Sequence, residues 1–307
     1  MNKATREAYG EALVELNKRN KNVVVLDADL SKSTKTAEFQ KVCPERFFNI
    51  GIAEADMIAT AAGLATCGKI PFVSTFAIFA AGRAYEQIRN SVAYPKLNVK
   101  IAATHAGITV GEDGATHQSI EDISLMRSIP NMVVINPSDD VETKYAVLQA
   151  AEYEGPVYIR LGRMTVPTIH DEHYKFQIGK GEILKSGNDV TIIATGIMVA
   201  MALEAAEELK KYGIDAEVIN IHTIKPIDKE LIISSAKKTG KIVTAEEHSI
   251  IGGLGSAVCE VLSQEYPTKV KMIGINDRFG QSGKPKDLLK EYGLTTQNII
   301  ETVKSFK

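Results

Sequence analysis

The segment Gly111–Gln118, GEDGATHQ, places two carboxylates and a histidine among glycines, shortly after the apolar run LNVKIAAT. Glycine allows the backbone to approach a ligand closely. Asp113 supplies a hydrogen-bond acceptor, and His117 supplies an imidazole, the type of side chain most often used for proton transfer. An ordinary strand-to-helix turn, in which Asp113 caps backbone amides and His117 faces water, explains the same residues. Local features alone therefore leave a ligand-binding loop and a turn as alternatives.

Other residues with useful chemistry follow apolar runs in the same way. The first run ends at Asp27-Ala28-Asp29, and Glu54 opens an otherwise apolar helical segment. Four more candidates stand at or just after the ends of other runs: Phe76, Phe79, His105 and Arg163. Aromatic rings beside a lone glutamate suit a planar heteroaromatic ligand whose ring nitrogen bonds the carboxylate. We predict that these residues meet at one rim.

Such a rim needs a scaffold that brings strand ends together. Short, β-branched apolar runs alternate with segments of helical spacing, for which we expect helices over 57–68, 79–93 and 119–129. Strands this apolar are covered on both faces, and their alternation with helices is typical of a parallel sheet. Ligands of these sheets bind beyond the carboxyl ends of the strands. The sequence therefore predicts an α/β fold with a doubly wound, largely parallel sheet.

The pattern lapses after Arg163 and then restarts. Residues 164–181 contain a proline, two histidines, mixed charges and glycines without a sustained period, which indicates a linker. Strands are expected again over 189–196, 215–224, 241–248 and 269–275, with helical segments between them. We predict two doubly wound α/β domains, residues 1–178 and a smaller domain over 179–307.

Composition narrows the function classes. Of the 307 residues, 44% are hydrophobic and 24% charged, and the formal net charge is −2, which argues against nucleic acid or an acidic membrane surface as a partner. No apolar run approaches the roughly 18 residues that span a bilayer. Cys43, Cys67 and Cys259 are scattered, so they indicate a reducing compartment and neither zinc nor disulfides. Because the N-terminus lacks an apolar signal-peptide core, we expect a cytoplasmic protein.

Specific segments resemble a known family. FFNIGIAEADMIATAAGLA, PFVSTFAIF, THAGITVGEDGATHQSIEDISLMRSIPNM and NPSDDVET resemble the pyrimidine-binding domain of transketolase. VTIIATG, HTIKPID and VTAEEHSIIGGLGSAV are similar to the C-terminal domain that transketolases share with deoxyxylulose-phosphate synthases and 2-oxoacid dehydrogenase β subunits. The resemblance implies a thiamine-diphosphate-dependent transferase of the pentose phosphate pathway. Such an enzyme moves a two-carbon ketol unit from a ketose phosphate to an aldose phosphate.

Part of a complete transketolase has no counterpart here. The domain that binds the cofactor diphosphate through Mg²⁺ carries a GDG motif followed by an asparagine, and this sequence has no GDG. It begins at KATREAYGEAL, where the pyrimidine-binding domain starts. The resemblance therefore implies the C-terminal subunit of a split transketolase, without metal ligands of its own. An N-terminal subunit would supply the diphosphate and Mg²⁺ sites, and the two chains would form a heterotetramer.

The resemblance also implies roles for cofactor-binding residues. Glu54 matches the catalytic glutamate that bonds the pyrimidine ring. Phe76 matches the aromatic residue that stacks on this ring, Phe79 a second wall, and Asp29 an acidic residue near the cofactor. Where the family often has a tyrosine, this chain has Gly82. Either the wall is thinner there or another residue, such as Tyr85, closes it.

A second set of residues is implied to bind the sugar. Asp113 would accept a hydroxyl next to the reacting carbon, and His117 would bond oxygens at the cleaved bond and move a proton. The residues that match phosphate-binding positions are Arg6, Ser33, His105 and Arg163. Arg160 is a rival of Arg163 for that role, because both guanidinium groups suit phosphate.

Two other functions stay open. The first is the matching portion of a 1-deoxy-D-xylulose-5-phosphate synthase, which has a segment like NIGIAE but carries its diphosphate domain on the same chain. The second is a non-catalytic binding or regulatory relic of the fold. Loss of Glu54, Asp113 or His117 would mark a relic, and all three are present. The sugars, the partner and the stoichiometry cannot be read from the sequence.

Overall fold

The first half of the chain is built on a seven-stranded sheet. In the computed structural model, which describes residues 2–306, the strand order is β12-β6-β7-β5-β4-β2-β3, and only the β12–β6 pair is antiparallel. The six parallel strands are β2 (Val23–Asp27), β3 (Phe47–Asn49), β4 (Ile70–Phe76), β5 (Lys100–Thr104), β6 (Val133–Ile135) and β7 (Val157–Arg160). The predicted parallel α/β sheet is confirmed.

Both faces of this sheet are covered. Val23 and Val25 belong to one buried cluster and Val24 and Leu26 to the other, because successive side chains of a strand point to opposite faces. The covering helices are α1 (Thr5–Arg19), α2 (Ser31–Thr34), α3 (Ala37–Val42), α4 (Glu54–Thr66), α5 (Ala77–Arg83), α6 (Tyr85–Gln87), α7 (Asp122–Ser128) and α8 (Asp140–Glu152). Single turns of tighter or wider helix occupy Pro44–Arg46, Ile88–Ala93 and Ile108–Val110. A sheet covered in this way explains the near-continuous apolar runs.

Two predicted helices differ from the structure. The helix expected over 79–93 is broken at Ala84, whose φ of −114° and ψ of 13° are not helical; Gly82, a poor helix former, lies two residues earlier. The helix expected from 119 begins only at Asp122. Ser119 instead forms a bridge with Ala106, and its carbonyl accepts a hydrogen bond from the Gly107 amide at 2.8 Å.

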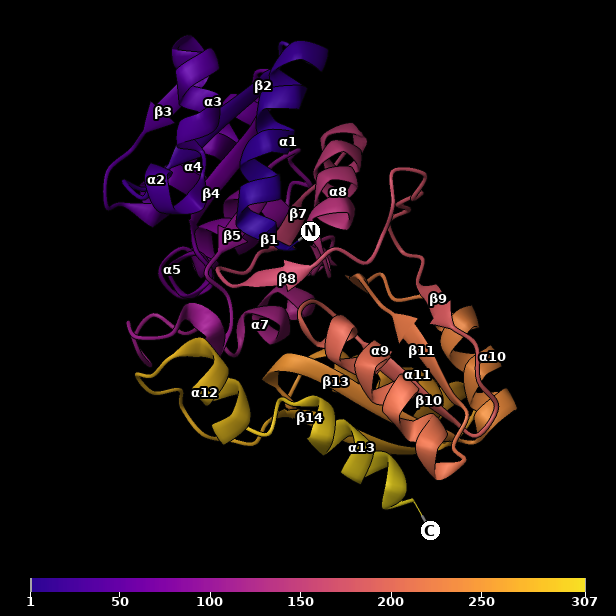
Figure 1. The fold of residues 1–307 in the computed structure, drawn as a ribbon. Coiled ribbons are helices and arrows are strands. Elements are labelled where there is room, and N and C mark those ends of the chain that lie inside the picture. The colour runs from indigo at the N-terminus through magenta and orange to yellow at the C-terminus, as the bar shows by residue number, and fades with distance from the viewer. Residues whose placement is uncertain (1, 307) are drawn as a thin grey trace.

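The second half of the chain forms a smaller sheet, drawn in orange and yellow in Figure 1. The strand order is β14-β13-β10-β11-β9, with β9 antiparallel to its neighbour. The strands are β9 (Glu182–Lys185), β10 (Val190–Ala194), β11 (Ala216–Asn220), β13 (Lys241–Ser249) and β14 (Lys269–Ile275). The helices are α9 (Met198–Leu209), a turn over Lys210–Tyr212, α10 (Lys229–Thr239), α11 (Leu254–Glu265), α12 (Pro285–Glu291) and α13 (Thr296–Lys304).

Of two short strands outside the expected pattern, β12 joins the two halves of the chain and β8 pairs within the first half. The expected strand over 215–224 is split: β11 ends at Asn220, and β12 (Thr223–Lys225) crosses over to pair with β6 of the first sheet. The Lys225 amine secures this edge by donating to the backbone carbonyl of Arg127 at 2.8 Å. Within the expected linker, β8 (Thr165–Pro167) pairs with β1 (Asn2–Ala4). The proposed division at 178/179 stays a prediction.

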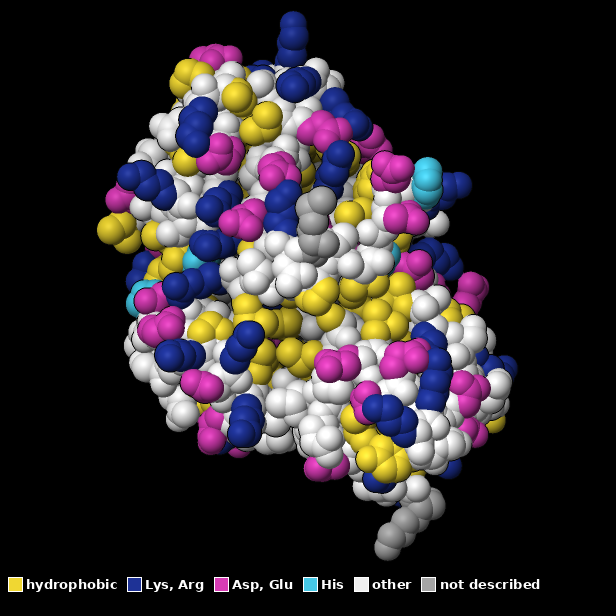
Figure 2. Space-filling view, in the orientation of Figure 1, with side chains coloured by type: hydrophobic (Ala, Val, Ile, Leu, Met, Phe, Trp, Pro, Cys, Tyr) yellow, Lys and Arg dark blue, Asp and Glu magenta, His cyan; other side chains and the backbone are white. Residues whose placement is uncertain are grey.

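One face of the molecule carries an apolar band. On the face drawn in Figure 2, hydrophobic side chains gather in a band across the middle, and charged side chains are spread above and below it. Among residues 2–306, no helix combines the length and the apolar character needed to cross a membrane.

Candidate active site

Parallel register brings the ends of four strands to one edge of the large sheet. Asp27 lies opposite Ser74, Phe76 opposite Thr104, and Ala103 opposite Arg160. The segments that follow these strands therefore start side by side, as expected for a sheet whose ligands bind beyond the carboxyl ends. Most of the rim residues predicted from the sequence lie on these segments.

Four planar side chains meet at this edge. The His105 ring stacks on Phe76 with centroids 3.9 Å apart, and Phe76 lies nearly parallel to Phe79, at 5.7 Å and an interplanar angle of 12°. The His117 ring is steeply inclined to Phe79, at a centroid distance of 5.3 Å and an interplanar angle of 72°. Residues from β4, the end of β5 and the segment GEDGATHQ thus converge, and their aromatic surface suits a flat ligand.

Glu54 stands beside these rings. It is the first residue of α4 and is only 4% exposed, in a helix whose other buried residues are apolar. Its Oε1 accepts a hydrogen bond from the guanidinium of Arg83 at 2.9 Å. The same guanidinium lies 4.0 Å from the centre of the Phe79 ring. Sequence reasoning missed Arg83, although its place four residues after Phe79 on one helix puts the two side chains on the same face.

His105 is held as a neutral imidazole. Burial lowers its pKa to about 3, helped by the positive charges of Arg6 and Arg163 and by His117. Arg6 Nη1 lies 3.2 Å from Nε2 of His105, and Thr104 Oγ1 lies 2.9 Å from Nδ1. Because a guanidinium only donates, Nε2 is the acceptor and Nδ1 carries the proton. His105 also has a φ of 57°, so the backbone leaves the extended conformation where β5 ends.

The positively charged candidates lie next to His105. Arg6 donates to the backbone carbonyl of Ser33 at 2.9 Å. Arg163 donates to the carbonyl of Val110 and has its Nη1 3.7 Å from the Asp113 carboxylate. Because both Arg6 and Arg163 lower the pKa of His105, the two guanidinium groups act on the same imidazole. This part of the rim is suited to an anion.

Arg160 does not belong to this rim. Its side chain is 3% exposed and forms an ion pair of 2.9 Å with Asp122, which is fully buried. A second nitrogen of the guanidinium donates to the backbone carbonyl of Glu247 at 2.9 Å. Arg160 therefore joins the two halves of the molecule, whereas the Arg163 side chain is 37% exposed. Binding of a phosphate by Arg163 stays a prediction.

Asp29 lies one strand away from the rings. It has a φ of 63°, and its carboxylate accepts from the Asn49 side-chain amide at 2.9 Å. The neighbouring Asp27 is buried and accepts from the hydroxyls of Thr34 and Thr36 at 2.7 and 2.8 Å. These bonds shape the segment after β2. Within residues 2–306, no hydrogen bond or ion pair joins Asp29 to the ring cluster.

The second half of the molecule holds GEDGATHQ in place. The side-chain amide of Gln118 donates to the carbonyl of Gln281 at 2.9 Å. Gly111 has a φ of 89°, and a Cβ there would lie 3.2 Å from Pro285 at the start of α12. The side chain of Asp113 stays 48% exposed and, among the described residues, caps no backbone amide. The capping role expected for a simple turn is therefore not seen.

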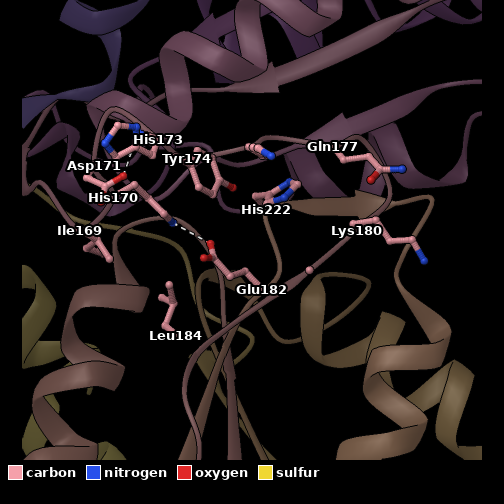
Figure 3. Close-up of a pocket in the computed structure, with 12 residues that line it drawn as sticks. Ile169, His170, Asp171, His173, Tyr174, Gln177, Lys180, Glu182, Leu184 and His222 are labelled. Carbon is pink, nitrogen blue, oxygen red and sulfur yellow. Dashed lines mark hydrogen bonds and ion pairs between the residues drawn. The ribbon is translucent and has the colours of Figure 1, made fainter.

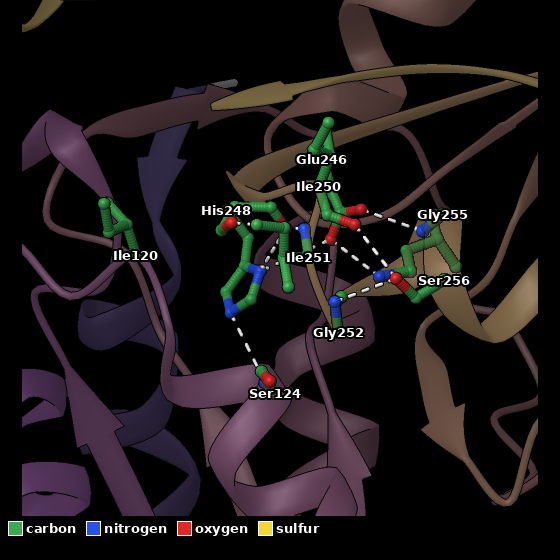
Figure 4. Close-up of polar contacts among 12 residues, drawn as sticks. Ile120, Ser124, Glu246, His248, Ile250, Ile251, Gly252, Gly255 and Ser256 are labelled. Atoms are coloured by element: carbon green, nitrogen blue, oxygen red, sulfur yellow. Dashed lines mark hydrogen bonds and ion pairs between the residues drawn. The ribbon is translucent and has the colours of Figure 1, made fainter. Parts of the chain in front are cut away.

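A second polar network lies between the halves, away from the rim. Glu246 accepts from the Leu254 and Gly255 amides at the start of α11 at 2.7 and 2.8 Å, and the Ser124 amide points at His248 Nε2 (Figure 4). Burial lowers the pKa of His248 to about 4. His248 thus serves as a neutral group in the contact between the two halves.

The segment 164–181, which was expected to be a linker, lines a cavity of about 510 Å³. His170 bridges Asp139 at 2.9 Å and Glu182 at 3.1 Å, and Tyr174 and His222 face the same space (Figure 3). Burial opposes the charged form of His170, but its hydrogen bonds to Asp139 and Glu182 outweigh burial and raise its pKa to about 10. His170 is an imidazolium that ties 164–181 to both halves.

Comparison with known proteins identifies the class to which this architecture belongs. Residues 1–168 match the family model of the transketolase pyrimidine binding domain, and residues 179–299 match that of the transketolase C-terminal domain. The chain belongs to the transketolase family and corresponds to the C-terminal part of a split transketolase.

Its relatives include chains of the same extent. A Methanocaldococcus jannaschii protein named as a transketolase C-terminal section is 58% identical over 304 residues, 98% of this chain and 95% of that protein. A 6-deoxy-6-sulfo-D-fructose transketolase subunit from Clostridium is 46% identical, covering 96% of this chain and 92% of the subunit. The solved structure of a split-gene transketolase, described as an inactive beta4 tetramer, superimposes with a TM-score of 0.93 at 60% identity, covering 98% of this chain and 97% of that one.

Single-chain transketolases extend beyond this chain. The Campylobacter jejuni transketolase structure superimposes with a TM-score of 0.84 at 27% identity, and the match covers 99% of this chain but 47% of that one. This chain therefore spans about half the length of that enzyme.

The family implies thiamine diphosphate as the cofactor, and the site fits its pyrimidine end. A nearly buried carboxylate beside stacked rings offers the hydrogen bond and the flat apolar surface that an aminopyrimidine needs. Within residues 2–306, no group of three or more His, Cys, Asp or Glu side chains is placed to hold a metal ion.

Proposed function

We propose that this chain is the C-terminal component of a thiamine-diphosphate-dependent transketolase that acts with a separate N-terminal subunit. The reaction would transfer a two-carbon ketol unit from a ketose phosphate to an aldose phosphate. The observation that supports it most strongly is the meeting, at one sheet edge, of Glu54 and two aromatic rings with the exposed polar segment around Asp113. Family membership makes this edge the expected pyrimidine site.

Glu54 and the rings would bind the cofactor. The Glu54 carboxylate holds a ring nitrogen of the aminopyrimidine, Phe76 and Phe79 fix the plane of that ring, and Asp29 contributes an acidic group nearby. When bound, thiamine diphosphate supplies the carbanion chemistry that breaks and forms carbon–carbon bonds. Glu54 can bond the ring nitrogen with little competition from water, because it is only 4% exposed at the start of α4.

Asp113 and His117 would orient the sugar. Asp113 accepts a sugar hydroxyl, and the His117 imidazole, next to Phe79, moves a proton at the oxygen of the reacting carbon. Arg163 and Arg6 attract the anionic end of the sugar, with the neutral His105 and Ser33 both next to Arg6. The substrate thus lies between the rings and the two guanidinium groups.

Relatives differ in the anion that their names specify. One is named for 6-deoxy-6-sulfo-D-fructose, and another, 39% identical, is an apulose-4-phosphate transketolase subunit. Sulfonate and phosphate both suit a guanidinium pair. A sugar phosphate is the substrate class we propose. The assembly would be a heterotetramer in which the partner subunit holds Mg²⁺ and the cofactor diphosphate.

A second candidate is the corresponding portion of a 1-deoxy-D-xylulose-5-phosphate synthase. Such a synthase from Desulfotalea psychrophila is 40% identical over 299 residues, covering 95% of this chain but 46% of the enzyme. Pyruvate used as the donor, in place of a ketose phosphate, would distinguish this reaction from ketol transfer.

Reconstitution tests the proposal. The chain is mixed with the N-terminal transketolase subunit of the same organism, thiamine diphosphate and Mg²⁺, and ketol transfer is measured. We expect activity only from the mixture, and a loss of about a hundredfold or more in kcat for Glu54→Gln, equal to about 2.8 kcal/mol of activation free energy. Asp56→Asn, an exposed acid on the same helical turn, should stay within a few-fold of wild type.

Two results would contradict the proposal. Turnover by Glu54→Gln close to that of wild type would remove the pyrimidine site from this edge. Tight, Mg²⁺-dependent binding of thiamine diphosphate by the isolated chain would remove the need for a partner subunit.

A further inference from the structure

Arg83 makes two contacts with one planar group. Its guanidinium donates to Glu54 Oε1 at 2.9 Å and covers the Phe79 ring at 4.0 Å. The covered face of Phe79 is therefore the face that lies next to the Glu54 carboxylate. No other side chain among the described residues bonds Glu54, so Arg83 neutralises a carboxylate that is 4% exposed.

These are the contacts that an aminopyrimidine would make. A flat ring of similar width would stack on an aromatic face and place a nitrogen against the same carboxylate. A guanidinium is planar, presents N–H donors in its plane and stacks on aromatic rings, so it imitates the edge and the face of such a ring. Two planar groups cannot occupy one face of Phe79 at the same time.

We propose that Arg83 is a built-in occupant of the pyrimidine position, which must leave Phe79 before a pyrimidine ring can bind. This inference rests on the proposed function, because it takes Glu54 and Phe79 as the pyrimidine site. It assigns Arg83 a role in setting cofactor affinity. Without ligand, Arg83 stabilises the buried carboxylate; with ligand, the ring nitrogen takes over that bond.

The surroundings of Arg83 allow it to leave. Its side chain is 50% exposed, so the guanidinium can reach water without opening the core. The preceding Gly82 has no heavy atom within 4 Å of the position that a Cβ would take, which leaves open space beside the helix end. Arg83 is the last residue of helix α5, and the non-helical Ala84 separates it from α6.

Tyr85, the sequence-based candidate for closing the wall at Gly82, is engaged elsewhere. Its hydroxyl lies 3.1 Å from Oγ of Ser128 at the end of α7. The planar group that covers Phe79 where the family often has a tyrosine nearby is thus the guanidinium of Arg83.

Occupancy by Arg83 lowers apparent affinity for the ligand. If Phe79 is uncovered in only a fraction of the molecules, the apparent Kd for the ligand equals the intrinsic Kd divided by that fraction. If Arg83 covers Phe79 in about 90–97% of the molecules, ligand binding is therefore about tenfold to thirtyfold weaker. Removing the guanidinium should recover this factor.

The test uses the full chain and 4-amino-5-hydroxymethyl-2-methylpyrimidine as the probe, with Kd measured by NMR titration. We expect Arg83→Ala to bind the probe about tenfold to thirtyfold more tightly than wild type. Arg89→Ala is the matched control, because Arg89 is an exposed arginine six residues further along the chain whose guanidinium donates to the Asn90 side chain. It should bind the probe as wild type does. Arg83→Gln is used as well, in case the alanine variant fails to fold.

A second measurement follows Arg83 itself. In wild type, the Arg83 Nε–H resonance should carry the ring-current shift of a group stacked on Phe79, and saturating probe should remove it. Equal or weaker probe binding by both Arg83 variants, or no detectable binding by any protein up to the solubility of the probe, overturns the inference. So does an Arg83 resonance that keeps its shift while the probe is bound.

Failure of the proposed function has a different signature. Glu54→Gln in the Arg83→Ala background should weaken probe binding if the ring nitrogen bonds Glu54. Unchanged binding in that double variant would mean that the probe lies elsewhere, which contradicts the pyrimidine site. A loss with Glu54→Gln but no gain with Arg83→Ala leaves the site in place and rejects Arg83 as its occupant.

Discussion

Arg160 and Arg163 lie three residues apart, yet one side chain is buried and the other is partly exposed to solvent. Arg160 is 3% exposed and paired with a fully buried Asp122 at 2.9 Å. Arg163 is 37% exposed, with the nearest carboxylates, those of Asp113 and Glu112, at 3.7 and 3.9 Å. The first charge is fully desolvated and satisfied by the protein; the second keeps contact with water and can exchange its partners.

The difference follows from where β7 ends. Arg160 is the last residue of the strand, and its side chain turns toward Asp122 and the Glu247 carbonyl of the second half. Arg163 comes after the chain has passed the sheet edge, beside Val110 and Asp113. A buried ion pair is sensitive to the loss of one partner, whereas exposed pairs contribute about 0–1 kcal/mol. The interior network should therefore govern stability, and the rim should govern binding.

The largest effect is expected from removing one partner of the buried pair. Arg160→Leu should lower the free energy of unfolding by about 3–5 kcal/mol, because Asp122 is left as an uncompensated buried charge. Arg163→Leu should change it by less than about 1 kcal/mol. Urea denaturation of the two variants measures both values. Similar losses for the two arginines would mean that burial does not separate their roles.

This division could be predicted from the sequence only in part. Alternation of apolar runs with helical segments gave the parallel sheet, and strand ends gave the rim, because parallel strands bring their carboxyl ends to one edge. Nothing local distinguishes Arg160 from Arg163, since both follow the run PVYI. Their separation depends on Asp122 and Glu247, which are 38 and 87 residues away along the chain.

Long-range contacts also explain the other differences. β12 pairs with β6 of the first sheet and not with the strands of the second sheet. The spacing of apolar residues along the chain carries no information on that pairing. The pairing of Arg83 with Glu54 joins residues 29 apart. Its contact with Phe79 lies within one helical turn, so that spacing was the available signal.

The next effect concerns binding at the rim. Arg163→Ala should raise KM for a phosphorylated sugar about tenfold to hundredfold, because a charge-assisted hydrogen bond is worth about 1.5–3 kcal/mol. KM for the unphosphorylated analogue should change little, since the contact is remote from the reacting carbon. Steady-state kinetics of the reconstituted enzyme with both sugars gives the comparison. Equal increases for the two sugars would assign the anion to another residue, with Arg6 the first alternative.

A smaller effect, on pH dependence, probes another interior charge. The folded-state pKa of His170 is raised to about 10 from 6.5, so its contribution to stability is fully present below pH 6.5 and is lost as pH rises toward 10. The free energy of unfolding should therefore fall between these pH values in wild type and fall less steeply in His170→Asn. His173→Asn is the control, because the His173 side chain is 85% exposed. If the free energies of unfolding of wild type and His170→Asn fell equally with pH, the bridge from His170 to Asp139 and Glu182 would not carry a charge on His170.

The smallest effect on stability, and the most selective effect on function, is expected at Asp113 and His117. Both side chains lie on a segment that Gln118, Gly111 and the start of α12 already hold. Asp113→Ala and His117→Ala should therefore leave the free energy of unfolding within about 0.5 kcal/mol of wild type. Asp113→Ala should also reduce discrimination between donor sugars that differ in configuration at one hydroxyl, because a site built to bond a hydroxyl strongly rejects a misplaced one.

The two variants should differ from each other in pH dependence. His117→Ala should flatten the pH profile of kcat/KM near neutrality, because it removes the group that moves a proton, whereas Asp113→Ala should leave the shape of that profile unchanged. Unfolding curves, epimer preference and pH profiles measured on both variants separate a ligand-binding loop from a turn. If the segment only turns the chain, both variants would lose stability while epimer preference and pH profile stayed as in wild type, and the rim would then end at the rings and Arg163.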